Sequence, residues 1–275
     1  MKGNETYRLI VIEANEFGYF PPAALRASVV PGWENEVLVG LDKVFDDSSR
    51  HILMNKTKVI SINENNVVVD NNSRIEEYTD NVIPYDILIL ATGSSYTMPC
   101  RPNNNTTEGI KSNLRKLQSE IKDSENIVII GGGALGIEFA GEVQSYHHKR
   151  KNVKLIHSND TLVGKEVGVH NTVLSQLHDL NIEVLLDDRV ENIRDLSFGK
   201  CPEQVVKTKS GKEIKADFIL NATGTKPNIS LVENFDNSLI SDKKLIKVKP
   251  TLQIDSPKLE RVFAMGDIVN IDVSL

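Results

Sequence analysis

The chain has 275 residues, which is enough to bury a sizeable core and to form about two domains. Its 40% hydrophobic and 25% charged residues are typical of a soluble globular protein. A net charge of −6 argues against a nucleic-acid partner, because no basic excess is present to neutralise phosphates. The short basic run His147 to Lys151 is interpreted as a solvated helix end, where cations suit the helix dipole.

Other classes are disfavoured by what the sequence lacks. No apolar run approaches the roughly 20 residues of a membrane-spanning helix, and the first residues show no secretory pattern. Cys100 and Cys201 lie far apart and form no CxxC, which disfavours a disulfide framework, a zinc site and a flavin-linked disulfide reductase. The histidines show no metal-binding spacing, so no metal site is expected. These features favour a reducing, cytoplasmic compartment.

Short apolar runs alternate with helical periodicity, which predicts an α/β fold. Strands are expected at 9–12, 67–69, 87–90, 127–130, 153–156, 184–186, 205–207 and 218–220, and helices at 112–121, 134–146 and 170–180. Several strands are apolar on both faces, as in a parallel sheet that helices cover on each side. The stretch 98–107, rich in Pro and Asn, is interpreted as a linker, and two α/β blocks are expected to divide near residue 120.

The first predicted strand, in YRLIVIEANEFGYFPP, ends at Glu13. In dinucleotide-binding folds, an acidic residue at such a strand end accepts hydrogen bonds from a ribose 2′-hydroxyl. In those folds this strand is the second one, and it follows a glycine-rich loop and a helix. Only six residues precede the stretch here, so the glycine-rich loop must be sought elsewhere.

The strongest motif is NIVIIGGGALGIEFAGE, in which an apolar strand enters a GxGxxG pattern formed by Gly131, Gly133 and Gly136. The first glycine permits a tight turn, the second lets the backbone approach a pyrophosphate, and the third lets helix and strand pack closely, as does Ala140. The following helix offers free N–H groups to phosphates. The motif predicts nucleotide binding; the alternative is a glycine-rich turn without a ligand. The next strand ends at His157 without a carboxylate, which leaves NADH or NADPH open; His157 itself is read as an ordinary strand-end residue.

Three further strand ends carry ligand-site signals. YDILILATGS and ADFILNATGTKPN both end an apolar strand in Ala-Thr-Gly, where glycine allows close backbone approach to a ligand. The repeat of this pattern predicts two related nucleotide domains. In RVFAMGDIVN a strand precedes Gly266 and Asp267 and the expected start of a helix, so Asp267 either binds a cofactor or caps that helix.

In this order the motifs resemble those of flavoproteins with two dinucleotide-binding domains. PPAALRASV after the acidic strand end, GGGALGIEFAGE, VKLIHS, ATGTKPN and MGD are similar to the apoptosis-inducing-factor-like, ferroptosis-suppressor-type branch, which is close to type II NADH dehydrogenases. The resemblance covers nearly the whole chain. It implies two Rossmann-like domains, with an NAD(P)H-binding domain at 121–245 inserted into an incomplete FAD-binding domain at 1–120 and 246–275.

The resemblance also implies a chemistry. NAD(P)H would pass hydride to FAD, and electrons would then go to a small-molecule acceptor, with a quinone favoured. The flavin carries this chemistry, so no catalytic side chain is expected. Members of the branch often meet the quinone at a membrane surface, which leaves peripheral membrane contact open for this chain.

Site residues are carried over from the family by motif. Glu13 would bind the FAD ribose, Arg26 would contact FAD or form a structural salt bridge, and Val59 would face the adenine through its backbone. Glu138 would face the nicotinamide or remain a helix-surface carboxylate. Thr92 and Gly93 would line the flavin site, Asp267 would hold the ribityl–phosphate region, and Gly131, Gly133 and Gly136 would bind NAD(P)H. The remaining cofactor-binding positions, at the strand ends, are Ala91, Gly224 and Gly266.

The sequence departs from the family at both ends. The first strand, glycine-rich loop and helix of the FAD domain are not found, nor is the part that follows Gly-Asp. We therefore expect a fragment or a shortened gene product with a complete NAD(P)H domain. The alternative function is a catalytically silent nucleotide-binding or interaction protein derived from such an enzyme.

Overall fold

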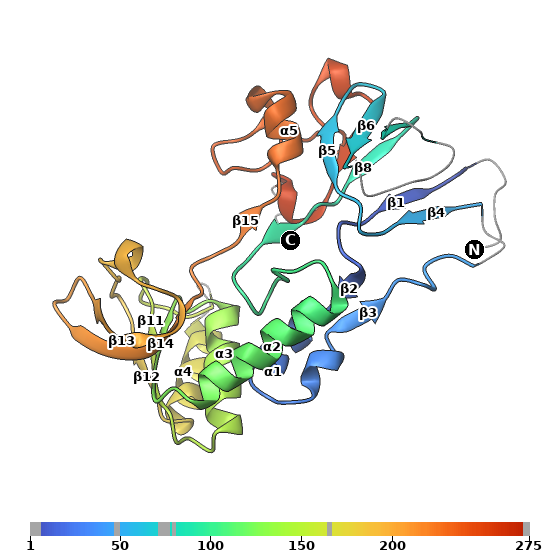
Figure 1. The fold of residues 1–275 in the computed structure, drawn as a ribbon. Helices are drawn as coiled ribbons and strands as arrows, with labels where there is room; N and C mark the ends of the chain where they lie inside the picture. The colour runs from blue at the N-terminus through green and yellow to red at the C-terminus, as the bar shows by residue number, and fades with distance from the viewer. Residues whose placement is uncertain (1–6, 47–49, 71–77, 79–80, 164–166, 272–275) are drawn as a thin grey trace. The chain divides into compact units, whose positions relative to one another are not determined.

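The structure is a computed structural model that describes residues 7–46, 50–70, 78, 81–163 and 167–271 (Figure 1). Packing divides the chain into two units. Unit 1 comprises Met1–Gly18, Gly40–Tyr96 and Thr225–Leu275, and unit 2 comprises Tyr19–Val39 and Thr97–Gly224. Each unit is therefore built from segments that are distant in the sequence.

Unit 1 contains small sheets and short helices. Its parallel pairs are β1 (Ile10–Ile12) with β4 (Ile52–Met54) and β8 (Leu88–Leu90) with β16 (Val262–Ala264). An antiparallel sheet contains β5 (Val59–Ile62), β6 (Asn66–Val69) and β7 (Val82–Pro84), and β9 (Ser94–Ser95) pairs with β15 (Lys226–Pro227). Its helical segments are α5 (Ser230–Phe235), η3 (Asn237–Leu239), η4 (Pro257–Leu259) and η5 (Gly266–Ile268).

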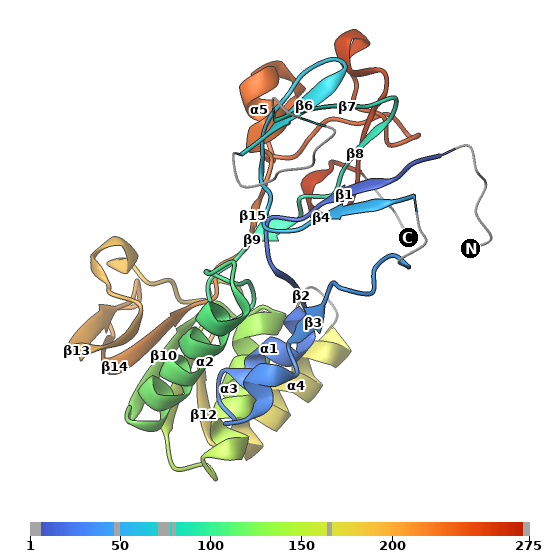
Figure 2. The same ribbon diagram turned by 45° about the vertical axis from the view of Figure 1, so that its right-hand side comes forward.

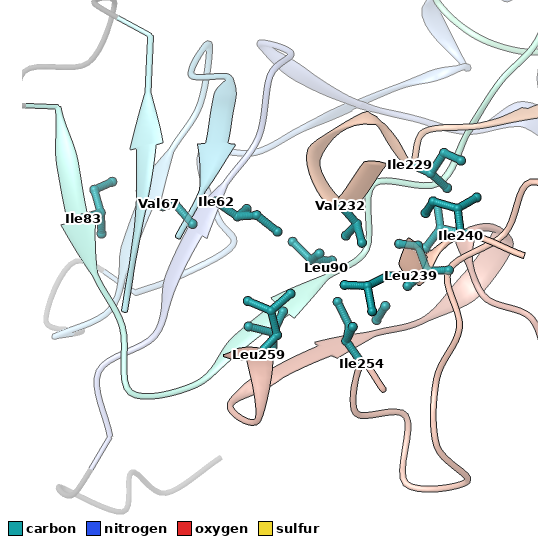
Figure 3. Packing of buried hydrophobic residues seen from close by; sticks show 14 of the residues in the cluster. Ile62, Val67, Ile83, Leu90, Ile229, Val232, Leu239, Ile240, Ile254 and Leu259 are labelled. Atoms are coloured by element: carbon teal, nitrogen blue, oxygen red, sulfur yellow. The ribbon is translucent and has the colours of Figure 1, made fainter. Parts of the chain in front are cut away.

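One hydrophobic core holds unit 1 together. In Figure 3 the side chains of Leu90, Val232, Leu239 and Ile254 converge from β8, α5 and the last part of the chain. The same cluster includes Ile62, Val67 and Ile83 from the antiparallel sheet. Because each buried aliphatic side chain contributes about 1.5–3 kcal/mol, this core joins the return segment after residue 225 to the first strands.

Unit 2 is a five-stranded sheet with helices. The strand order is β12 (Ile182–Leu185), β11 (Asn152–Ile156), β10 (Asn126–Ile130), β14 (Glu213–Asn221) and β13 (Gly199–Lys207). The first four strands are parallel, and β13 pairs antiparallel with β14. The helical segments are α1 (Pro21–Ala27), η1 (Trp33–Asn35), α2 (Thr107–Lys122), α3 (Ala134–Tyr146), α4 (Val167–Asp179) and η2 (Ile193–Asp195). The short strands β2 (Phe17–Tyr19) and β3 (Leu38–Gly40) pair where the chain passes between the units.

The α/β class is confirmed, and most expected elements are present. Helix α3 has the predicted bounds, and the apolar strand before the glycines is β10. Helix α2 begins at Thr107, five residues before the expected start, because Thr106 Oγ1 accepts a hydrogen bond from Gly109 N and caps it. The predicted linker therefore ends in a helix cap.

The packing units have other bounds than the domains expected from the sequence, and the expected domain division itself stays a prediction. Residues 19–39 and 97–120, which were expected in the first block, pack in unit 2, and the return to unit 1 comes at 225 rather than 246. Helix α1 forms because two prolines start it and helix-favouring residues follow. It packs on α3 (Figure 2), with Ala24 and Ala27 buried against Leu114 of α2. The assignment of a cofactor to each part of the chain stays a prediction.

Candidate functional site: the glycine-rich turn and the strand ends

The glycine-rich turn of unit 2 is tightly packed on two sides. Gly131 follows β10 with φ of 118°, and a Cβ there would lie 2.4 Å from the carbonyl oxygen of Ala222. A Cβ on Gly136 would lie 2.0 Å from the carbonyl oxygen of Gly131. Any side chain at either position would therefore push the turn away from β14 or from the first turn of α3.

Gly133 differs from these two glycines because it faces open space. A Cβ on Gly133 would meet nothing within 4 Å, and its backbone is extended, with φ of −79° and ψ of 179°. It is the N-cap of α3, and no side chain caps this helix. The first N–H groups of the helix therefore lack intrahelical partners and are directed at the space in front of the turn, where an anion is stabilised.

A pocket of about 870 Å³ lies in front of this turn. It is lined by Gly132, Gly133, Ala134, His157, Ser158, Asn159, Asp160, Thr161, Val163 and Asp187. These residues follow the carboxyl ends of β10, β11 and β12, which is the edge where open parallel sheets bind ligands. The glycine motif and the pocket thus coincide in one unit.

The side chain of His157 contacts the glycine-rich turn through a hydrogen bond. Its Nδ1 accepts a hydrogen bond from Gly132 N at 3.1 Å, and its Nε2 lies 3.1 Å from the carbonyl oxygen of Thr161. This pair of contacts fits a neutral ring with the proton on Nε2. Burial lowers the pKa of His157, although the bond to Thr161 opposes this effect. His157 is therefore more than an ordinary strand-end residue, because its ring links the glycine-rich turn to Thr161.

Glu138 lies on an exposed part of α3 and forms no ion pair among the described residues. Burial, aided by the charge of Glu138, raises the pKa of Cys100 to about 11. Cys100 therefore remains a protonated thiol at neutral pH, when a reactive centre would need the thiolate. Cys100 and Cys201 are both free cysteines. For Glu138, the predicted position facing the nicotinamide stays a prediction.

In unit 1, two expected motifs meet at the carboxyl ends of the neighbouring strands β8 and β16. Ala91, Thr92 and Gly93 follow β8, and Gly266 and Asp267 follow β16. Ser94 Oγ donates a 2.7 Å hydrogen bond to Asp267 Oδ2. Asp267 lies inside η5, whose N-cap is Met265, so among the described residues its carboxylate accepts from Ser94 rather than capping a helix.

Asn228 joins the first ATG turn to the segment after the second. Its Nδ2 donates to the carbonyl oxygen of Thr92, its own carbonyl oxygen accepts from Thr92 Oγ1, and its N–H donates to Gly93 O. Sequence reasoning missed this residue, although its position at the end of ATGTKPN, four residues after Gly224, was a signal. Gly224, with φ of 132°, lies just before this segment, at the end of unit 2.

Glu13 and Val59 are also placed in unit 1. Glu13 follows β1, and its Oε1 accepts hydrogen bonds from the N–H and Nδ2 of Asn15. Val59 forms an antiparallel pair with Val69, and the flanking bond from Asp70 N to Lys58 O makes this a non-hydrogen-bonded pair. The N–H and C=O of Val59 therefore point away from β6, toward the edge of the described sheet, where a ligand could meet them.

Arg26 belongs to unit 2 and is held by protein groups. Its Nε lies 3.1 Å from Glu142 Oε1, and its guanidinium lies 5.1 Å from the Trp33 ring centroid. These contacts are those of the structural salt bridge that the sequence left open. Contact between Arg26 and a flavin stays a prediction, as do the cofactor roles of the other named residues.

A parallel sheet whose central strand turns through three glycines into a helix defines unit 2 as a Rossmann-type dinucleotide-binding fold. The family model described as "Pyridine nucleotide-disulphide oxidoreductase" matches residues 9–274. The chain belongs to this family.

Curated relatives agree with this assignment. The chain is 30% identical to Fe-regulated protein 8 of Mycosarcoma maydis, over 96% of this chain and 67% of the relative. It is 28% identical to Ferroptosis suppressor protein 1 of Homo sapiens, over 90% of this chain and 64% of the relative. It is 27% identical to Apoptosis-inducing factor 1 of Saccharomyces cerevisiae, over 96% of this chain and 68% of the relative. The resemblance to the ferroptosis-suppressor-type branch is thereby confirmed.

Solved structures share the fold. Bacillus anthracis CoADR-RHD superposes with a TM-score of 0.72 at 20% identity, over 97% of this chain and 47% of that one. A ferredoxin reductase from Rhodopseudomonas palustris superposes with a TM-score of 0.72 at 18% identity, over 97% of this chain and 63% of the reductase. The NADH oxidase of Lactobacillus brevis, solved bound to NADH, superposes with a TM-score of 0.71 at 16% identity, over 97% of this chain and 58% of the oxidase. The chain therefore spans about half to two thirds of these proteins. No described helix is both long and apolar enough to cross a membrane.

Proposed function

We propose that the chain acts as an FAD-dependent oxidoreductase that takes hydride from NAD(P)H and passes electrons to a quinone or a similar acceptor. The observation that carries the proposal is the open Gly133 position at the start of α3, between two glycines that packing forbids to carry side chains. Such a turn admits a pyrophosphate against the backbone and the helix N-terminus. Family membership over 9–274 supports the redox class.

On this proposal, unit 2 would bind the pyridine nucleotide. The N–H groups of Gly133 and Ala134 would meet its pyrophosphate, and the pocket beside His157 and Asp187 would take its adenosine half. The described lining of this pocket carries the carboxylates of Asp160 and Asp187 and no Lys or Arg. A 2′-phosphate would find no cation among these residues, which supports NADH over NADPH.

Unit 1 would bind FAD. Glu13 would accept from the adenosine ribose, the backbone of Val59 would face the adenine, and Thr92, Gly93 and Asp267 would hold the flavin half. The flavin, when bound, would supply the hydride and electron chemistry. The role of the protein residues is to bind and orient it. The quinone-type acceptor and a cytoplasmic or membrane-peripheral setting rest on the resemblance to the ferroptosis-suppressor-type branch and stay part of the proposal.

The test uses the full chain. After incubation with FAD and removal of unbound flavin, the retained visible absorbance reports the FAD site, and NADH consumption with a soluble quinone reports the reaction. We expect bound flavin and quinone-dependent turnover above the rate of free flavin. NADH binding without flavin retention or turnover would instead support a catalytically silent nucleotide-binding protein. Failure to bind NADH as well would refute the reading of the glycine-rich turn.

A further inference from the structure

The segment 157–163 lies against the glycine-rich turn and holds the middle residue of that turn, Gly132. The N–H of Gly132 donates to His157 Nδ1 at 3.1 Å, and the carbonyl oxygen of Gly132 accepts from Val163 N at 3.4 Å. A Cβ on Gly132 would lie 2.6 Å from Leu162 Cδ2 and 2.8 Å from His157 Cγ. Both backbone groups of Gly132, and the space beside it, are therefore taken up by this segment.

The segment is itself fixed by several contacts. His157 follows β11, and its Nε2 lies 3.1 Å from the carbonyl oxygen of Thr161. The N–H of Leu162 donates to Nδ1 of His170 on α4 at 3.1 Å, and the Leu162 side chain is fully buried. Val163 has φ of 56°, which is unfavourable for a β-branched residue and persists only where the surrounding contacts impose it. The hold on Gly132 is therefore part of a fixed structure.

The His157 ring acts on a ligand only through the turn. Both of its nitrogens are engaged by backbone groups, so the ring offers no donor to a molecule in the pocket. Gly133 and Ala134 follow Gly132 directly, and their N–H groups are those that the proposed function assigns to the pyrophosphate. The position of these two N–H groups thus depends on the bond between His157 and Gly132.

This bond exists only while the imidazole is neutral. A neutral ring with its proton on Nε2 accepts at Nδ1 and donates to the carbonyl oxygen of Thr161, whereas a protonated ring carries an N–H on both nitrogens. The Nδ1–H of the protonated ring would face the N–H of Gly132, which leaves two donors without an acceptor, and the turn has to move away from the ring. His157 therefore couples a protonation state to the shape of the turn.

The titratable groups on the elements around His157 are mostly acidic. They are Asp160 on its own segment, Asp187 and Asp188 after β12, and His170 on α4. Carboxylates favour a protonated ring. The pKa of His157 is nevertheless lowered, with burial as the largest cause and the bond to Thr161 opposing it. The ring is therefore mainly neutral at neutral pH and becomes a cation only in acid.

We propose that His157 is a positioning residue for the dinucleotide, and that its neutral ring holds the turn in the form that binds the pyrophosphate. Protonation of the ring releases Gly132 and weakens binding. The inference rests on the proposed function and adds to it a residue that acts without touching the ligand. Direct electrostatics has the opposite sign, because a cation near the pyrophosphate would strengthen binding. That attraction is screened by salt, whereas the loss of the acceptor acts on the turn itself.

The test measures the affinity of the full chain for ADP-ribose, which keeps the adenosine and pyrophosphate of NADH and is stable in acid. Calorimetry is run at about 0.15 M salt, from about pH 7.5 down to about pH 5, and circular dichroism checks that the chain is folded throughout. The affinity should be constant above the pKa of His157 and fall about tenfold per pH unit below it, because binding then requires the release of one proton. By reciprocity, saturating ADP-ribose should lower the pKa of the His157 ring, which NMR measures.

Matched variants separate the acceptor from the charge. His157→Asn keeps an acceptor for Gly132 N but does not titrate, so its affinity is expected to be reduced at neutral pH and independent of pH over this range. His157→Ala has no acceptor and should bind at least about threefold more weakly than His157→Asn at neutral pH. His178→Asn, at an exposed position on α4 outside the pocket lining, should keep the pH profile of the parent chain.

The outcomes distinguish this inference from the proposed function. An affinity that is constant or rises in acid, a ring pKa that the ligand raises, or equal affinities of the Asn and Ala variants of His157 would each overturn the inference and leave the proposed function in place. A parent chain that does not bind ADP-ribose at any pH would overturn the proposed function and the inference with it.

Discussion

Gly136 and Gly131 approach so closely that a single methyl group on the former would lie 2.0 Å from the carbonyl oxygen of the latter. Gly136→Ala is therefore expected to lower the free energy of unfolding by about 1–3 kcal/mol, the usual effect of overpacking. Denaturant unfolding measures this loss. Gly141→Ala is the control, since Gly141 lies in the same helix with its nearest neighbour at 3.9 Å. The control should be neutral or stabilising by up to about 1 kcal/mol, and equal losses in both variants would contradict the packing argument.

Gly133→Val should separate binding from stability. Space is open around this position and its backbone is extended, so the free energy of unfolding should change by less than about 1 kcal/mol. NADH affinity, measured by calorimetry, should fall at least about tenfold, because the side chain would occupy the place of the pyrophosphate. A variant that binds NADH as well as the parent chain would remove the main support for the proposed function.

His157 predicts a pH dependence of stability. Its pKa is lowered in the folded protein, so the unfolded chain binds the proton more readily. The stabilisation is present above the unfolded pKa of about 6.5 and is lost as the pH falls through the lower folded value. Denaturant unfolding at neutral pH and at about pH 5.5 measures this loss. His157→Asn keeps an acceptor for Gly132 N but does not titrate, and it should lose that part of the pH dependence.

Glu34 predicts a loss of stability at lower pH than His157 does. Burial alone would raise its pKa, but hydrogen bonds from Arg115, Gln118 and Gly32 outweigh burial and hold the pKa at about 2. Its stabilisation is present above the unfolded pKa of about 4.3 and is lost as the pH falls toward 2. Glu34→Gln should reduce stability by about 1–3 kcal/mol at neutral pH, since the bond to Arg115 loses its charge assistance. An unfolding curve unchanged by this substitution would contradict the assignment.

Local patterns predicted the parts of the site that depend on local geometry. The tight turn at Gly131, the packing at Gly136 and the bounds of α3 follow from residue types at fixed spacing, and the structure agrees with each. Contacts between distant residues could not be read in this way. Ser94 and Asp267 are 173 positions apart, and the hydrogen bonds of Asn228 to Thr92, Gly93 and Ser95 also join distant segments.

The bounds of the two packing units could not be read from the sequence for the same reason. The Pro- and Asn-rich stretch before Thr107 has the composition of a linker, and composition does not reveal which core a neighbouring helix joins. Gln118 makes a contact that could not be predicted from the sequence. Its buried Nε2 donates to the carbonyl oxygen of Ala27, 91 positions earlier, which ties α2 to α1 within unit 2.

The interleaving of the two units has a consequence for synthesis on the ribosome. All segments of unit 2 have been made once residue 224 is added, so it can fold while the rest of the chain is still being translated. Unit 1 must wait for Thr225–Leu275, which supplies β16, α5 and much of its core. Until then, strands β1, β4 and β8 lack their partners in that core, and this interval is when the nascent chain is most exposed to aggregation and most in need of a chaperone.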